Sequence, residues 1–285
     1  MGIPIQWPLV LFTLVAGTGA GLIAAACVAE FAGLKDEKLQ FKAGIVALVL
    51  LVAGGCFSLL HLASPGNVMA AVTNIGSFSG ISMELILLGA TFIAALVYLI
   101  VVKRAGFGVA SKVIGVVTII AALLFMFYSG HGYIMESRPA WNTTILPLAY
   151  LGTSLATGAF LFALLQALAK EPGSFKAVKI ILLVSAIICA CVCAAWAVSI
   201  KSTGAASPVM YWGGLVICGI VAALALGCFA FLKLDESNAK VWTAVGVVVF
   251  LIATLAVRVL MWQAGDGFLD LFSSAAGGAI TAWLP

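Results

Sequence analysis

Two ionisable side chains, His61 and Glu84, lie at the edges of apolar segments that read SLLHLASP and GISMELILLG. A charge inside the hydrocarbon of a bilayer costs several kcal/mol, so an intramembrane carboxylate is a candidate for function. An imidazole, whose unperturbed pKa is about 6.5, can accept and release a proton near neutral pH. If the segments are adjacent membrane helices, both side chains lie at the same end and can take protons from a buried redox ligand. The structural alternatives are a Glu84 carboxylate stabilised by a helix N-terminus and a His61 ring hydrogen-bonded to a loop carbonyl.

The composition indicates which elements position these side chains. Of 285 residues, 64% are hydrophobic and 8% are charged, and the mean hydropathy is +1.25. Such values exclude a soluble globular domain, and continuous apolar runs favour helices over a β-barrel. The first run lacks the charged start and cleavage site of a signal peptide, so we expect it to remain as a helix. We predict an all-α bundle, a single transmembrane domain over residues 1–285, with eight membrane helices. The predicted helices are approximately 8–30, 41–62, 83–103, 111–131, 147–168, 177–200, 211–232 and 241–262.

The positive charges lie mainly on one face of this predicted bundle. Eleven of the fourteen Lys and Arg residues flank the loops after the first, third, fifth and seventh helices, and only Arg138, Lys201 and Arg258 belong to the other face. Loops rich in Lys and Arg stay in the cytoplasm, which predicts both termini on the outer, periplasmic side of a bacterial cytoplasmic membrane. His61 and Glu84 then fall on the outer side.

All seven cysteines fall inside the apolar runs, and none has the CxxC spacing of a zinc or iron–sulfur site. Cys189, Cys191 and Cys193 alternate, so on a helix they are expected to point to different faces. We interpret the cysteines as small packing residues, and we expect no metal in this chain.

Two further residues leave alternatives open. With His61, His131 could supply the second axial imidazole of a haem b between the second and fourth helices, or it could be an interfacial loop histidine. Arg258 lies within the last predicted helix, where an unpaired guanidinium is expensive. It could extend outward to the interface, or it could pair with Glu84 or Glu136.

Four pieces of the chain, in order, carry a recognisable pattern: WPLVLFT (7–13), SLLHLASP (58–65), GISMELILLG (80–89) and Arg258 in the last helix. Together with eight helices and an outward N-terminus, they resemble the DmsC-like membrane anchor subunit of the DMSO reductase (molybdopterin oxidoreductase) family. The resemblance extends over nearly the whole chain.

This resemblance implies an anchor subunit without redox metal that binds and oxidises menaquinol. It implies two soluble partners on the outer face, a molybdopterin catalytic subunit and a ferredoxin-like iron–sulfur subunit that receives the electrons. It places quinol binding and proton release on His61 and Glu84, and we add Ser64 and Arg258 as candidate contacts to the quinol. A secondary transporter remains as a competing class, for which inverted repeats and helices broken near the midplane are expected.

Overall fold

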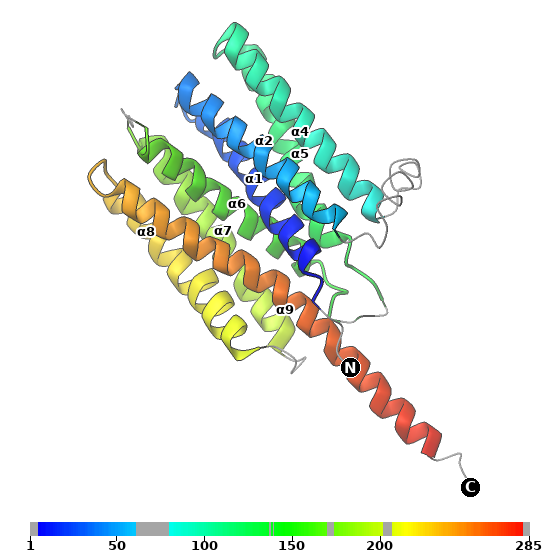
Figure 1. Ribbon diagram of the computed structural model, residues 1–285. Helices are drawn as coiled ribbons and strands as arrows, with labels where there is room; N and C mark the ends of the chain where they lie inside the picture. Colours follow the sequence, from blue (N-terminus) through cyan, green and yellow to red (C-terminus); the bar gives the residue numbers. More distant parts are fainter. Residues whose placement is uncertain are drawn as a thin grey trace.

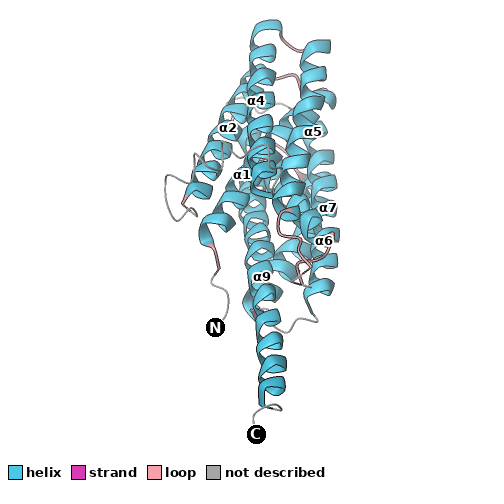
Figure 2. Cartoon of the chain, turned by 90° about the vertical axis from the view of Figure 1, so that its right-hand side faces the viewer, coloured by secondary structure: helices cyan, strands magenta, loops and turns pink. Residues whose placement is uncertain are grey.

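The computed structural model describes residues 5–60, 80–136, 138, 140–169, 174–201 and 207–281, and for residue 81 and residues 266–281 it describes the backbone only. All regular elements of this part are helical (Figures 1 and 2). They are α1 (Trp7–Phe31), α2 (Glu37–Leu59), α4 (Gly80–Ala105), α5 (Val109–His131), α6 (Ile145–Ala167), α7 (Lys176–Lys201), η2 (Val209–Ala222), α8 (Ala223–Lys233) and α9 (Ala239–Thr281).

Eight stretches of the described chain are long and apolar enough to cross a membrane, with η2 and α8 forming one span together. This confirms the prediction of eight membrane helices. The second one begins at Glu37 rather than at 41, because the Asp36 carboxylate accepts a hydrogen bond from the backbone N–H of Leu39 (3.0 Å) and caps the helix. None of the eight described spans is broken near its middle, whereas discontinuous helices are expected in a transporter.

The helices form two groups, one of α1, α2, α4 and α5 and the other of α6, α7, η2–α8 and α9 (Figure 1). The groups meet along α1 and α6, which are the two most buried spans. Glycines allow this contact: a Cβ on Gly21 would collide with the backbone of Ser154, and one on Gly158 would collide with the backbone of Gly21. In membranes, close backbone approach takes the place of the hydrophobic driving force between helices. Gly21 and Gly158 therefore serve to pack α1 against α6.

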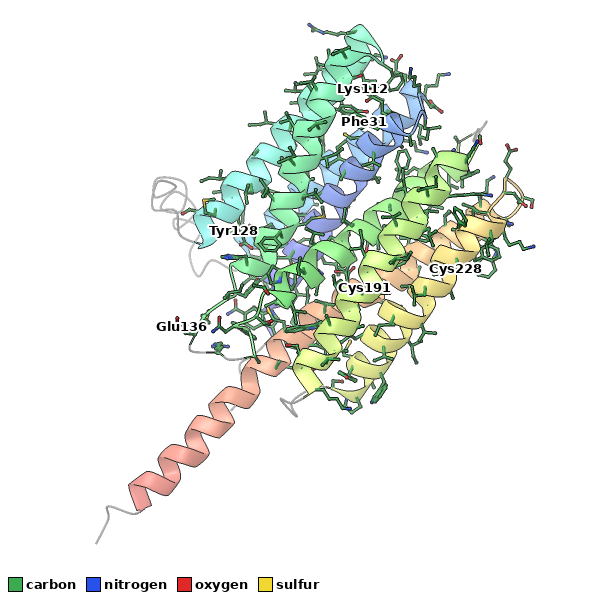
Figure 3. All side chains as sticks on the ribbon, turned by 180° about the vertical axis from the view of Figure 1, so that it is seen from behind. Phe31, Lys112, Tyr128, Glu136, Cys191 and Cys228 are labelled. Atoms are coloured by element: carbon green, nitrogen blue, oxygen red, sulfur yellow. The ribbon has the colours of Figure 1, made fainter. Side chains whose placement is uncertain are left out.

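The outside of the bundle is covered with exposed aliphatic side chains, as expected for a surface that faces lipid. Cys191 and Cys228 belong to this surface (Figure 3). The expectation that three alternating cysteines point to different faces was wrong for two of them. Cys189 and Cys193 are one helical turn apart, both are buried, and their Sγ atoms are 3.9 Å apart. Of these three cysteines, only Cys191 is exposed and points away from the core.

Two spans depart from regular expectation. Val209–Ala222 is a π-helix, wider than an α-helix, and in it Gly219 packs so closely on Cys193 that a Cβ would lie 2.8 Å from the sulfur. The last helix was predicted to end near 262 but continues to Thr281, and its final part projects beyond the bundle (Figures 1 and 2). The reason is that residues 263–281 contain no proline to stop the helix.

The two ends of the bundle can be told apart by their residues. Phe31 and Lys112 lie at one end, whereas Tyr128 and Glu136 lie toward the other (Figure 3). The second end carries the start of α1, the start of α4, the end of α5 and the projecting part of α9 (Figure 1). We call it the Glu84 end, and we call the opposite one the Glu30 end.

Candidate functional site

The end of α2 and the start of α4 lie next to each other at the Glu84 end. A Cβ on Gly55, near the end of α2, would be 3.3 Å from a methyl group of Leu88, one turn after Glu84. His61 and Ser64 follow α2 in the sequence and lie outside the described residues. The structure therefore places Glu84 and brings α2 against α4, whereas the pairing of His61 with Glu84 lies outside the described residues and stays a prediction.

Glu84 lies in the second turn of α4, and its carboxylate is not fully satisfied. The side chain is partly buried, and its Oε1 atom is shielded from solvent with no hydrogen-bond partner among the described residues. The backbone of Gly132, directly after α5, lies close by, since an added Cβ there would be 3.8 Å from Oε1. A buried polar atom without a partner is costly and calls for an explanation, such as a ligand, water or a catalytic role.

An aromatic cluster closes the bundle beside Glu84. The ring of Tyr133 lies at 5.9 Å from Trp141, 5.9 Å from Trp262 and 6.1 Å from Tyr150. The indole N–H of Trp141 donates to the carbonyl of Met261 (2.7 Å), which fastens the loop after α5 to α9. Burial raises the pKa of Tyr133 well above its ordinary value. Its neighbours Tyr150 and Glu84 add to that rise and Arg258 opposes it, so the phenol stays protonated and available as a donor.

Arg258 is buried in the core, with 1% of its surface exposed. Its Nε–H donates to the hydroxyl oxygen of Thr13 (2.9 Å), and one N–H of Nη2 donates to the carbonyl oxygen of the same residue (3.0 Å). The other two bonds reach Ser154 Oγ (3.1 Å) and the Thr254 carbonyl (3.0 Å), and the guanidinium carbon lies 4.3 Å from the centre of the Tyr150 ring. The expected outward extension of Arg258 is therefore wrong, because neutral oxygens inside the bundle already replace the water that the guanidinium would seek.

The predicted ion pairs of Arg258 are also absent from the described residues. No salt bridge joins Arg258 to Glu84, and Glu136 is an exposed loop residue (Figure 3). Arg258 and Glu84 nevertheless act on the same neighbours, because both contribute to the electrostatic environment of Tyr133 and Tyr150. Two tyrosines thus feel both charges, of which the cation is held by α1, α6 and α9 and the anion is carried by α4.

The sequence contains one signal for the binding of Arg258, in the motif at the start of the first helix. Thr13 is the last residue of WPLVLFT, the motif at the start of the first helix, and in the structure its carbonyl and hydroxyl oxygens bind Arg258. Two motifs that lie far apart in the chain are therefore one structural unit. Tyr150, Ser154 and Thr254 carried no comparable signal.

His131 ends α5 as an exposed residue whose ring stacks on Tyr128, with the ring centres 5.1 Å apart. His131 thus belongs to the last turn of a helix and not to the loop, and its location at a membrane interface stays a prediction. Whether it shares a ligand with His61 is not tested, because His61 lies outside the described residues. The part of the chain that the structure describes contains no cluster of three or more His, Cys, Asp or Glu side chains that could hold a metal ion.

A second buried acid, Glu30, was missed in the sequence although it interrupts an apolar run. It lies in the last turns of α1 at the opposite end of the bundle and is 1% exposed. The Tyr98 hydroxyl donates to one of its oxygens (2.9 Å), and the Ser111 hydroxyl lies 2.5 Å from the other. Glu30 therefore connects α1 with α4 and α5, and both of its oxygens have partners.

Comparison with known proteins places this arrangement in a family. A family model described as the DMSO reductase anchor subunit (DmsC) matches residues 1–263. Among curated proteins, the anaerobic dimethyl sulfoxide reductase chain YnfH of Escherichia coli (strain K12) is 27% identical over 189 residues, which are 65% of this chain. The match covers 66% of the relative, so the chain spans just under two thirds of its length. With eight helices able to span a membrane and a family match over α1 to the buried arginine of α9, the chain is a multi-pass membrane protein that belongs to the DMSO reductase anchor subunit family.

Proposed function

We propose that this anchor subunit binds and oxidises a quinol, in the first place menaquinol, at the Glu84 end of the bundle. A quinol that becomes a quinone gives up two protons and two electrons. His61 and Glu84 accept the protons, and the electrons pass to an iron–sulfur partner subunit, which delivers them to a molybdopterin catalytic subunit. The observation that carries this proposal is the buried Oε1 of Glu84, which has no hydrogen-bond partner among the described residues.

The geometry suggests how Glu84 would act. An unpartnered carboxylate oxygen can accept a hydrogen bond from a quinol hydroxyl and then its proton. Its helix lies against the end of α2, so a hydroxyl held at Glu84 would be close to the segment that continues to His61 and Ser64. We assign Ser64 a supporting hydrogen bond to the quinol headgroup.

Arg258 takes a different role from direct contact in this proposal. Its four hydrogen bonds all go to protein oxygens, and one face of the guanidinium covers Tyr150. We propose that it acts as a fixed positive charge that favours the deprotonated state of groups beyond Tyr150 and Tyr133. In a poorly polarisable interior such a charge acts over a longer distance than in water.

We infer the direction of proton release from the charge pattern of the loops. The positive-inside bias supports a Glu84 end that faces the outside, so we propose that the protons are released outward and that both soluble partners dock on that side of the cytoplasmic membrane. Accessibility of a single cysteine introduced at Glu136 to an impermeant thiol reagent, in whole cells, tests the orientation. A control cysteine at Lys112, at the other end, should stay unlabelled.

The experiment that tests quinol oxidation uses the assembled complex. Binding of a quinol analogue and quinol-dependent turnover are measured for wild type, His61→Ala and Glu84→Gln, and each variant is also tested with an artificial donor that reduces the catalytic subunit directly. We expect both variants to lose analogue binding and quinol turnover while the artificial-donor activity stays at the wild-type level. Wild-type quinol turnover in both variants would refute the proposal. A reduced-minus-oxidised spectrum of the purified subunit separately decides the haem b alternative.

A further inference from the structure

A charged hollow lies at the Glu30 end, between the start of α2 and the end of α4. It has a volume of about 420 Å³, and three lysines line it: Lys38, Lys42 and Lys103. One carboxylate, that of Glu37, is also part of the lining, so the hollow carries excess positive charge. Its remaining walls are apolar and include Phe41 and Ile45.

Helix packing fixes the position of Lys103 in this hollow. Gly44 lets α4 approach α2, because a Cβ at that position would collide with the side chain of Leu99. Lys103 follows Leu99 by one helical turn, so the same contact brings its side chain over α2. There its Nζ lies 3.6 Å from Glu37 Oε1 and 5.6 Å from the centre of the Phe41 ring.

The other two lysines have no such commitment. Lys38 and Lys42 are one turn apart on α2, both are exposed, and neither forms an ion pair with an acid of the described residues. They also line a second hollow, of about 490 Å³, on the other side of α2 against the end of α6. The one acid there, Asp36, already accepts the capping hydrogen bond of α2 from Leu39. Among the described residues, no acid forms an ion pair with either of these two ammonium groups, which stand between the two hollows.

The first hollow opens onto the surface that faces lipid. Ile45 in its wall is the first of a row of exposed aliphatic residues on α2, followed by Val49 and Val52 one turn apart each, with 60% and 52% of their surfaces exposed. A ligand held by the lysines can thus extend along α2 with an apolar tail. A free inorganic anion would leave these apolar walls unused, and a purely apolar molecule would leave the ammonium groups without a partner.

We propose that this hollow binds an anionic phospholipid, with the headgroup phosphate between Lys38, Lys42 and Lys103 and an acyl chain along Ile45, Val49 and Val52. Basic pockets between membrane helices at the cytoplasmic side suit phosphate headgroups, and each nearby lysine adds to the attraction of anionic lipid. The site is at the end opposite to Glu84 and does not depend on the proposed quinol chemistry. Its role is to fill the hollow that remains between the start of α2 and the end of α4 beside the Lys103–Glu37 ion pair.

The experiment uses the full chain, purified and freed of lipid by detergent exchange. Native mass spectrometry and thermal unfolding are followed while phosphatidylglycerol, cardiolipin, phosphatidylethanolamine or inorganic phosphate is added. We expect the two anionic lipids to bind and to raise the unfolding temperature, and zwitterionic phosphatidylethanolamine and inorganic phosphate to have little effect. The variant Lys38→Gln/Lys42→Gln/Lys103→Gln should bind anionic lipid at least about tenfold more weakly, because three charges near the headgroup are lost.

A matched control removes three lysines elsewhere at the same end, Lys176→Gln/Lys179→Gln/Lys233→Gln. It should keep wild-type lipid affinity, since it changes the net charge equally but leaves the hollow intact. Equal losses in both triple variants would overturn the proposal in favour of a diffuse charge effect. Unchanged binding in the first variant, equal binding of phosphatidylethanolamine, or stabilisation by inorganic phosphate alone would each overturn it as well. A Lys38→Arg/Lys42→Arg/Lys103→Arg variant that restores binding would support it.

Discussion

Glu30 and Glu84 are acids in the same group of helices, and each has a carboxylate oxygen shielded from solvent, but they differ in hydrogen bonding. At Glu30, Tyr98 and Ser111 supply a partner for each carboxylate oxygen, and the side chain connects three helices. At Glu84, one buried oxygen has no partner in the described residues, and the backbone of Gly132 lies close to it. Hydrogen-bond satisfaction, and not burial by itself, is therefore what makes Glu84 rather than Glu30 the candidate for function.

The strongest test of this comparison makes the same change at both places. Glu84→Gln should lower quinol turnover of the complex by about 100-fold or more, the range expected for loss of a general base. Glu30→Gln should leave turnover per folded complex close to wild type, because hydroxyl groups of Tyr98 and Ser111 already occupy both carboxylate oxygens. Steady-state assays with quinol and with an artificial donor measure both. A comparable loss of turnover in Glu30→Gln would break the comparison.

The free energy of unfolding should depend more on Glu30 than on Glu84. Glu30→Ala leaves the buried Tyr98 hydroxyl without its acceptor and should lower the free energy of unfolding by about 1–3 kcal/mol. Glu84→Ala removes a buried oxygen that has no partner among the described residues, so its effect on stability should be smaller. Denaturant unfolding in detergent micelles compares the two. Greater destabilisation by Glu84→Ala would show that its carboxylate has a structural partner after all.

A substitution in the loop after α5 should cause a smaller loss of stability, confined to the Glu84 end of the bundle. Trp141→Phe removes the indole bond to the Met261 carbonyl but keeps an aromatic ring, and it should cost about 1 kcal/mol. We expect faster hydrogen exchange in residues 132–145 and little change around Ser111. Exchange measured by mass spectrometry gives both regions at once. Equal changes at both ends would mean that the ends are not independent.

The smallest expected change in stability and turnover comes from a substitution that gives Glu84 Oε1 a hydrogen-bond partner, which it lacks among the described residues. The backbone φ of Gly132 is −58°, and an added Cβ would be 3.8 Å from Glu84 Oε1, so Gly132→Ser fits and places a hydroxyl near that oxygen. We expect about 0.5–1 kcal/mol more stability and a severalfold lower quinol turnover, because the oxygen is no longer free. Gly132→Ala is the control and should show neither change. Unaltered turnover in Gly132→Ser would argue that the free oxygen is not used.

Much of the fold was predictable because a bilayer leaves few choices. Runs such as 83–103 must be helices to satisfy their backbone, and their ends were right to within a few residues. The extension of α9 to Thr281 was not foreseen, because hydropathy reports where a helix leaves the lipid and not where it ends. The π-helix over Val209–Ala222 likewise leaves no mark in the pattern of apolar residues.

The site was predicted less completely, for a physical reason. Glu84 could be singled out because the cost of burying a carboxylate is visible from sequence alone. The fate of Arg258 could not, because four acceptors from three helices stabilise it, and two of those acceptors are backbone carbonyls that every residue has. Glu30 was overlooked near the end of an apolar run, although the same argument about cost applied to it.

The contact between Gly21 and Ser154–Gly158 has a mechanical consequence. It sets the register of α1 against α6, and it lies about two turns from Thr13 on α1 and one turn or less from Ser154 on α6. Oxygen atoms of Thr13 and Ser154 accept hydrogen bonds from the Arg258 guanidinium, so the spacing of α1 and α6 also sets the distance between these acceptors. A single methyl group added at Gly21 would push the two helices apart. The buried charge would then lose hydrogen bonds without any change to a residue that contacts it.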